Sequence, residues 1–305
     1  MKGIWWTLVS ALCTATLITV SKVVLANTDS FAFGFVLMTG VASYLVVYLL
    51  YNFGYKKIFE LIKENYLYLL VVGIFGFSIN SLVYLGLQLS TSINAAVLAR
   101  SDVLFTALLG YMFFGEKLSK IDWFAFGVLF IGIFMVLDMN FSEFRFNKGD
   151  FLLLLSVIFL SLNAVIIRYK LNSIPRSLIA LANSGVCAIL FFLTILFTNR
   201  FYFVVGIFSY KVLIIFAIIL QGLIFVTYYK GLNLLPTWLV RSIYLIIPGV
   251  NLLLGMSLLN ESISLMQIKG LTLIIIGVLI ISYGQRNQKL CPKEDENKAK
   301  DTLII

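Results

Sequence analysis

Long apolar stretches alternate with short polar ones along almost the whole chain. Each apolar stretch has about the 20 residues that an α-helix needs to cross the hydrocarbon core of a bilayer. The joints between them carry loop-like sequences, such as NTDS at 27–30 and FGEKLSK at 114–120. We therefore predict an all-α integral membrane protein with ten transmembrane helices. The predicted spans are 3–26, 32–52, 66–88, 93–114, 120–138, 150–170, 177–198, 211–230, 236–259 and 264–284.

The basic residues predict how these spans are oriented. Of the 23 Lys and Arg residues, 15 fall on one side of the predicted spans and five on the other, while Lys22, Arg100 and Arg241 fall inside them. Basic loops stay in the cytoplasm, so both termini are predicted to be cytoplasmic. The mixed-charge segment 285–305 contains few large apolar residues before its end and is predicted to be a disordered cytoplasmic tail.

The composition agrees with a lipid environment. Hydrophobic residues make up 61% of the chain and charged residues 12%, whereas a soluble domain carries roughly 25% charged residues. The net charge of +9 does not indicate a nucleic-acid partner, because the basic residues stand in short clusters between apolar runs. Histidine is absent and Cys13, Cys187 and Cys291 are far apart, so we expect no metal site and no disulfide framework.

The sequence gives little support for catalysis. It contains no histidine, no Ser or Cys with an evident base, and no paired aspartates of the intramembrane-protease type. No glycine-rich phosphate loop precedes a Lys and a Ser. We therefore predict a protein that is not an enzyme, needs no cofactor and does not hydrolyse ATP itself.

The two halves of the chain resemble each other at an offset of 145 residues. GLQL at 86–89 falls on GLNL at 231–234, and Glu116 falls on Glu261. Each half would hold five helices, and an odd number places the halves in opposite orientations in the membrane. Such inverted repeats suit alternating access, because two similar halves can exchange conformations. The predicted division is a first repeat at 1–140 and a second at 141–284.

Both halves contain a small-residue-rich helix, then Gly-Glu or Asn-Glu, a Ser, and an apolar helix with internal glycine. They read LLGYMFFGEKLSKIDWFAFGVLFIGIFMVL and LLGMSLLNESISLMQIKGLTLIIIGVLII. These segments resemble the EamA domain of the drug/metabolite transporter superfamily. The first copy has Ala125 and Val103 where the second has Gly270 and Pro248.

The EamA resemblance implies both a fold and a function. Similar members have ten helices and cytoplasmic termini and export amino acids or other metabolites, while relatives carry nucleotide sugars or phosphorylated sugars. We expect the bacterial inner (plasma) membrane as the location. We also expect a monomer or homodimer that binds a small-molecule solute.

Charged residues inside the predicted spans are candidates for a solute site, since a charge at the centre of a membrane helix costs about 2.5–3.5 kcal/mol. Arg100 lies about seven residues into the fourth span and Arg241 about five into the ninth. Arg241 corresponds to Ala96 in the repeat, one helical turn from Arg100, so the two side chains share similar faces. They are interpreted as binding a carboxylate or phosphate in a central cavity. Alternatively, each reaches the nearer interface or pairs with an internal acid.

Other charged residues have competing interpretations. Lys22 lies near the outer end of the first span, where it can line the site or extend to the interface. Asp102 is two residues from Arg100 and points to another face, so it either couples transport to protons or pairs with another helix. Glu116 and Glu261 close the fourth and ninth spans. They are either gate carboxylates or, as we favour, acceptors for backbone amides at the start of the next helix.

Uncharged polar residues and one proline complete the candidates. Pro248 is assigned a gate or structural role. An amide inside a span can bind solute but more often bonds a neighbouring helix. The predicted solute-binding set adds Tyr84, Asn163, Tyr229 and Asn251, with Asn80, Gln221, Tyr228 and Tyr244 as weaker candidates.

The leading hypothesis is a secondary transporter, in the export direction, for amino acids or organic anions. The alternatives are a transporter or exchanger of phosphorylated metabolites or nucleotides, and a flippase component acting on lipid carriers. A receptor or structural membrane subunit would lack a solvent-filled cavity between the halves.

Overall fold

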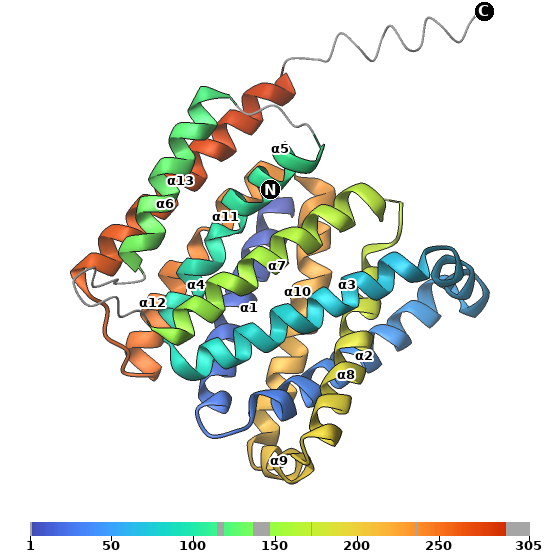
Figure 1. Ribbon diagram of the computed structural model, residues 1–305. Helices are drawn as coiled ribbons and strands as arrows, with labels where there is room; N and C mark the ends of the chain where they lie inside the picture. Colours follow the sequence, from blue (N-terminus) through green and yellow to red (C-terminus); the bar gives the residue numbers. More distant parts are fainter. Residues whose placement is uncertain (1, 115–118, 137–146, 172, 236, 291–305) are drawn as a thin grey trace, which may run out of the picture.

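The computed structural model describes residues 2–114, 119–136, 147–171, 173–235 and 237–290, and these residues form helices and connecting turns (Figure 1). The first half contains α1 (Lys2–Leu25), α2 (Ser30–Phe53), α3 (Tyr55–Leu89), α4 (Ser92–Leu98), the 3₁₀ turn η1 (Ala99–Ser101), α5 (Asp102–Phe114) and α6 (Lys120–Val136). The second half contains α7 (Lys148–Lys170), α8 (Arg176–Phe197), α9 (Phe201–Ile207), the 3₁₀ turn η2 (Phe208–Tyr210), α10 (Lys211–Leu234), α11 (Thr237–Ile243), α12 (Ile246–Leu258) and α13 (Leu265–Leu290).

Within the described ranges, seven helical segments are long and apolar enough to cross a membrane. The apolar parts of α12 and α13 are shorter, at Ile246–Leu258 and Leu265–Ile281. Many large apolar side chains face outward, among them Val47 at 69% and Tyr51 at 90% exposed. An all-helical protein with such a surface is an integral membrane protein. The count of ten spans stays a prediction.

The fourth and ninth predicted spans are broken helices rather than continuous ones. The fourth consists of α4, η1 and α5, and the ninth of α11 and α12 with a turn at residues 244–245. Pro248 contributes to the second break, because proline has no N–H for the carbonyl four residues earlier and its ring crowds that carbonyl. Discontinuous helices at membrane depth leave backbone and side-chain polar groups free to line a cavity.

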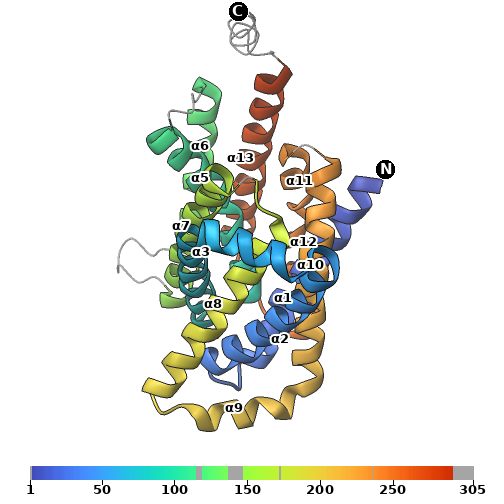
Figure 2. The same cartoon turned by 90° about the vertical axis from the view of Figure 1, so that its right-hand side faces the viewer.

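Three boundaries also differ from the predicted ones. α3 begins at Tyr55 instead of residue 66, with a kink at Asn65 (φ −122°, ψ 15°). The short helix α9 occupies a stretch predicted to be a loop and lies across one end of the bundle (Figure 2). α13 continues to Leu290, so the first six residues of the predicted disordered tail are helical. Residues 291–305 lie outside the described part, as does the predicted repeat boundary at residue 140.

The helices of the two halves correspond in order and spacing. α7 begins at Lys148, 146 residues after Lys2 of α1, and α12 begins at Ile246, 144 residues after Asp102 of α5. The packing partners correspond as well: α1 packs along α10 and α12, and α7 packs along α3 and α5.

α6 and α13 pack along each other at one edge of the molecule (Figure 1). A methyl group on Gly132 would lie 2.9 Å from the carbonyl oxygen of Gly270, and one on Gly277 would lie 3.2 Å from the carbonyl oxygen of Ala125. These two contacts occupy equivalent positions of the repeat, since Gly277 follows Gly132 by 145 residues and Gly270 follows Ala125 by the same number. Small residues thus let the two backbones approach closely.

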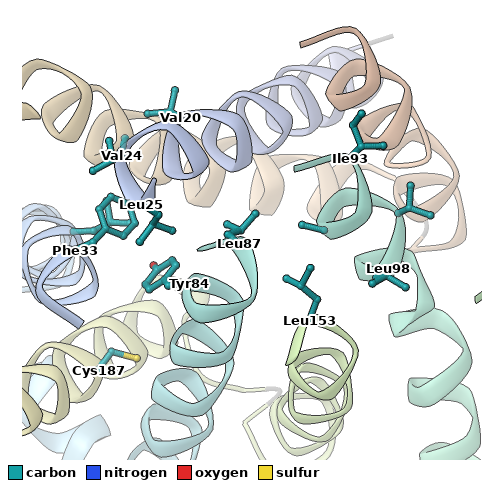
Figure 3. Packing of buried hydrophobic residues seen from close by; sticks show 14 of the residues in the cluster. Val20, Val24, Leu25, Phe33, Tyr84, Leu87, Ile93, Leu98, Leu153 and Cys187 are labelled. Carbon is teal, nitrogen blue, oxygen red and sulfur yellow. The ribbon is translucent and has the colours of Figure 1, made fainter. Parts of the chain in front are cut away.

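The largest apolar core joins the middle of the bundle to the end where α3 and α4 meet. Its side chains come from both halves, as Figure 3 shows for Val24 and Leu25 of α1, Leu87 of α3 and Leu153 of α7. This core borders the cavity beside Arg100, because Leu87 and Leu153 belong to both.

Candidate solute site at two helix breaks

The two helix breaks face each other near the middle of the bundle. The guanidinium carbon of Arg100, in η1, lies 5.8 Å from the centre of the Tyr244 ring, which occupies the turn between α11 and α12. The Tyr244 hydroxyl lies 2.6 Å from the hydroxyl of Ser10 in α1, and its ring packs edge-to-face on Tyr228, with 5.5 Å between the ring centroids. Arg100 at one break therefore faces Tyr244 at the other, and the contact with Ser10 of α1 fixes the position of Tyr244.

A cavity of about 160 Å³ lies beside Arg100. Four segments line it: α1, α3, the α4–η1 segment and α7. The lining residues are Thr14, Ile18, Val83, Leu87, Ala95, Ala99, Arg100, Leu153, Ser156 and Val157.

The polar groups of this cavity are a cation and two hydroxyls. The hydroxyl of Thr14 donates to the carbonyl oxygen of Ser10 (2.8 Å), and that of Ser156 donates to the carbonyl oxygen of Leu153 (2.6 Å). Because both hydroxyl protons are used within their own helices, each oxygen keeps a lone pair that can accept a hydrogen bond. The Thr14 hydroxyl also lies within hydrogen-bonding reach of the Tyr244 hydroxyl. The cavity thus offers donors from Arg100 for an anionic group and acceptors for an N–H or ammonium group.

Arg100 is half-buried and incompletely bonded. Its Nε is buried without a hydrogen-bond partner among the described residues. Asp102, two residues away, forms no ion pair with it and also has a buried carboxylate oxygen without a partner. A buried donor without an acceptor costs about 1–3 kcal/mol, so a carboxylate entering the cavity would remove that cost.

Lys22 lies at one end of the bundle and bonds to the protein itself. Its ammonium donates to the carbonyl oxygens of Leu87 (2.5 Å) and Ser90 (2.6 Å). These carbonyls end α3, where the helix dipole favours a cation. Lys22 is not among the residues lining the cavity, although Leu87 touches both regions.

Glu261 caps a helix of the other half of the chain. Its carboxylate accepts hydrogen bonds from the backbone N–H groups of Ser92 (2.7 Å) and Ile93 (3.2 Å) and from the Ser92 hydroxyl (2.9 Å), at the start of α4. The expectation that Glu261 binds the start of the next helix, α13, is wrong. The first turn of α13 is capped instead by two reciprocal hydrogen bonds between Ser264 and Gln267. Ser92, at the start of α4, lies 169 residues before Glu261 in the chain, but the fold brings the two into contact.

Three uncharged candidates lie apart from the cavity lining. Asn251 is fully buried, accepts from the Thr19 hydroxyl (3.1 Å), and so bonds α12 to α1. Tyr84 is buried against the rings of Phe33 and Phe191, with centroids 5.1 and 6.2 Å away (Figure 3). Asn163 is 4% exposed, and its Oδ1 has no partner among the described residues.

Several predicted residues cannot be placed in this site. Glu116 lies outside the described residues, as do the side chains of Arg241 and Tyr229. The backbone of Arg241 belongs to α11, and Pro248 is buried in the first turn of α12.

A polar network next to Glu261 was not predicted from the sequence. Asn94 donates to both carboxylate oxygens of Asp150 (3.1 Å each), the Ser90 hydroxyl also donates to Asp150, and Gln267 donates to the Asn94 carbonyl (3.0 Å). The network joins the end of α3 to α4, α7 and α13. Asp150 carries a weak sequence signal as an acid in the first turn of a helix, but its partners are up to 60 residues away.

Known proteins resemble this chain in sequence and fold. A sequence profile of the EamA-like transporter family matches residues 1–138 and 147–283. An uncharacterized transporter of Methanothermobacter thermautotrophicus (strain Delta H) is 30% identical over 112 residues. That match covers 35% of this chain and about a third (33%) of the relative's length.

A solved crystal structure of a protein shares the fold, with a TM-score of 0.62 at 18% identity, covering 93% of this chain and 97% of the other. The family profile matches both halves and most of the chain. The chain therefore belongs to the EamA-like transporter family.

Proposed function

We propose that this membrane transporter carries small carboxylate-bearing metabolites, such as amino acids or organic anions, without hydrolysing ATP. The observation that carries the proposal is Arg100: a half-buried guanidinium with a free donor, at a helix break, in the lining of a cavity of about 160 Å³. Arg binds carboxylates in bidentate fashion. The hydroxyl oxygens of Thr14 and Ser156 suit the ammonium group of an amino acid.

Among the described lining residues Arg100 is the single charged one. A phosphorylated metabolite or nucleotide would place more negative charge and more volume in this cavity. These features favour a small monoanion or zwitterion over the larger solutes. The export direction rests on the family resemblance alone.

The proposed mechanism is alternating access between two inverted five-helix repeats, with both termini in the cytoplasm. The matched order of helices and the paired contacts of α6 with α13 support the repeat. The excess of Lys and Arg on the side of the termini supports the orientation.

Unequal packing at the two ends of the bundle supports a conformational exchange. α3 packs closely along α8, whereas its counterpart α10 has far less contact with α2. α4 packs on α12, whereas α11 and α5 have no comparable packing among the described residues. In this mechanism, the well-packed end with Glu261 and Asp150 corresponds to a closed gate, and transport requires it to open while the other end closes.

The first experiment measures thermal stability of the purified protein with a library of metabolites, because a ligand stabilises the folded state that binds it. We expect carboxylate-bearing metabolites to raise the Tm and their amide analogues to have little effect. Arg100→Gln should weaken binding of the same metabolite by roughly 10–150-fold, as expected for a hydrogen bond to a charged group of about 1.5–3 kcal/mol. It should also abolish transport in reconstituted vesicles.

Arg200→Gln is the matched control, since Arg200 pairs with Asp29 at the surface and is absent from the cavity lining. It should keep both binding and transport. Transport by folded Arg100→Gln at the wild-type rate would remove Arg100 from the site. Stabilisation by phosphorylated metabolites alone would replace the proposed solute class with the phosphorylated one.

A further inference from the structure

A second, larger cavity lies between α2, α8 and α10. This groove has a volume of about 240 Å³ and shares no lining residue with the cavity at Arg100. Its lining is mostly apolar and aromatic, with two cations. The aromatic and apolar residues of the lining include Tyr44, Leu45, Tyr48 and Phe53, and the two cations are Arg176 and Lys230.

The two cations of the groove come from α8 and α10. Arg176 is the first residue of α8 and Lys230 lies in the last turns of α10; both are exposed. Both count among the 15 Lys and Arg residues on the predicted cytoplasmic side. This end of the groove is therefore expected at the headgroups of the inner leaflet.

Neither cation is neutralised by the protein. The one ion pair within the described ranges joins Arg200 to Asp29, so Arg176 and Lys230 have no carboxylate partner there. The ammonium of Lys230 lies 4.4 Å from the centre of the Trp6 ring, and tryptophan is enriched at the membrane–water interface. Both observations place unpaired positive charge at the level of lipid headgroups.

We propose that the groove binds an anionic phospholipid of the adjacent leaflet. Arg176 and Lys230 hold its phosphate, and one acyl chain lies against Tyr44, Tyr48 and Phe53. A lipid fits better than a soluble anion because the lining is mostly apolar and opens beside the outward face of α2, which is itself apolar. Basic pockets between membrane helices bind such headgroups. This site is separate from the proposed solute site.

The test uses the delipidated full-length protein in detergent, with phosphatidylglycerol or phosphatidylcholine of the same acyl chains added. Native mass spectrometry measures retained lipid, and thermal unfolding measures Tm. We expect phosphatidylglycerol to be retained and to raise the Tm more than phosphatidylcholine does. In Arg176→Gln/Lys230→Gln this difference should disappear.

Lys63→Gln/Lys120→Gln is the matched control, because it removes the same charge from exposed positions outside the groove. It should keep the preference for phosphatidylglycerol. The proposal is overturned if the Arg176/Lys230 variant keeps that preference, or if water-soluble glycerol phosphate gives the same rise in Tm. A solute bound at Arg100 should stabilise the groove variant as it does wild type, so the two proposals fail separately.

Discussion

Pro248 accounts for one of the two helix breaks beside the cavity but not for the other. Its ring cannot donate a hydrogen bond to the carbonyl four residues earlier, so the helix is interrupted there. Val103 occupies the equivalent position in the first half and has its N–H, yet the chain still forms a 3₁₀ turn at Ala99–Ser101. α7 packs against that turn, and its Ser161 hydroxyl lies 3.3 Å from the carbonyl oxygen of Asp102, the residue that follows the turn.

Glu261 illustrates how one side chain can connect the two halves. Its carboxylate accepts from two of the free N–H groups at the start of α4 and from the Ser92 hydroxyl, and its negative charge suits the positive end of that helix. The carboxylate also lies close enough to Lys22 to interact with it electrostatically. Losing its charge should therefore loosen contact between α4 and the end of α12.

We predict that Glu261→Gln lowers the free energy of unfolding by about 1–3 kcal/mol, because a charged acceptor is replaced by an amide whose N–H₂ group faces other donors. Thermal unfolding in detergent measures the change. Glu64→Gln, at an exposed position of α3, is the control and should unfold like wild type. An unchanged Tm for Glu261→Gln would show that these bonds contribute nothing to stability.

At the scale of helices, glycines on one helix have opposite roles depending on the face they occupy. Gly132 of α6 faces the backbone of α13, where a methyl group would lie 2.9 Å from the carbonyl oxygen of Gly270. Gly127 of the same helix is exposed and would meet nothing within 4 Å. The first glycine permits close packing of two helices, whereas the second only lowers helix propensity.

Alanine should destabilise the protein at Gly132 but not at Gly127. Gly132→Ala should lower the Tm, at a cost of about 1–3 kcal/mol for forcing the backbones apart. Gly127→Ala should leave the Tm unchanged or raise it, since alanine favours a helix over glycine by up to about 1 kcal/mol. Equal effects of both substitutions, measured by thermal unfolding, would rule out the close approach of α6 and α13.

At the scale of the whole molecule, the two ends of the bundle differ although the two halves correspond. Hydrogen bonds of Glu261 and Asp150 and the packing of α4 on α12 join several helices at one end. In the proposed mechanism the two halves exchange conformations during transport, and this end opens. A covalent bond across this end should therefore stop transport.

The pair Ile93→Cys and Gly255→Cys tests this expectation. A methyl group on Gly255 would lie 2.9 Å from Cγ1 of Ile93, so two cysteines there are close enough for a disulfide. It would also lie 2.7 Å from a carboxylate oxygen of Glu261, so the Gly255→Cys variant shifts that side chain. In a background without Cys13, Cys187 and Cys291, oxidation should abolish vesicle transport, and reduction should restore it.

The two single-cysteine variants serve as controls and should transport equally with or without oxidant. Normal transport by the fully oxidised double variant would contradict opening at this end. Solute binding should persist in the oxidised protein, since Arg100 is not altered.

The apolar pattern sufficed to predict an integral membrane protein made of helices, because a bilayer leaves the backbone few other ways to satisfy its polar groups. The family could also be predicted from the two EamA-like segments. Arg100 was identified as a site candidate from its charge inside an apolar span. These features depend on local composition or on motifs that a single chain displays.

Long-range contacts could not be predicted in this way. Tyr244 was a minor candidate, yet its ring lies beside Arg100, and Glu261 binds a helix 168 residues earlier in the chain. Lys22, Tyr84 and Asn251 look alike in sequence as polar groups in apolar spans, but the structure places them outside the cavity lining.

The sequence by itself determined the solvent, the helical class and the family of this protein, since hydropathy and motif are read along one chain. Tertiary structure alone decided which polar side chains share a cavity, where the fourth helix breaks and which helix Glu261 binds. Those features depend on the packing of helices far apart in sequence, where a polar residue bonds whatever acceptor the fold brings within about 3 Å.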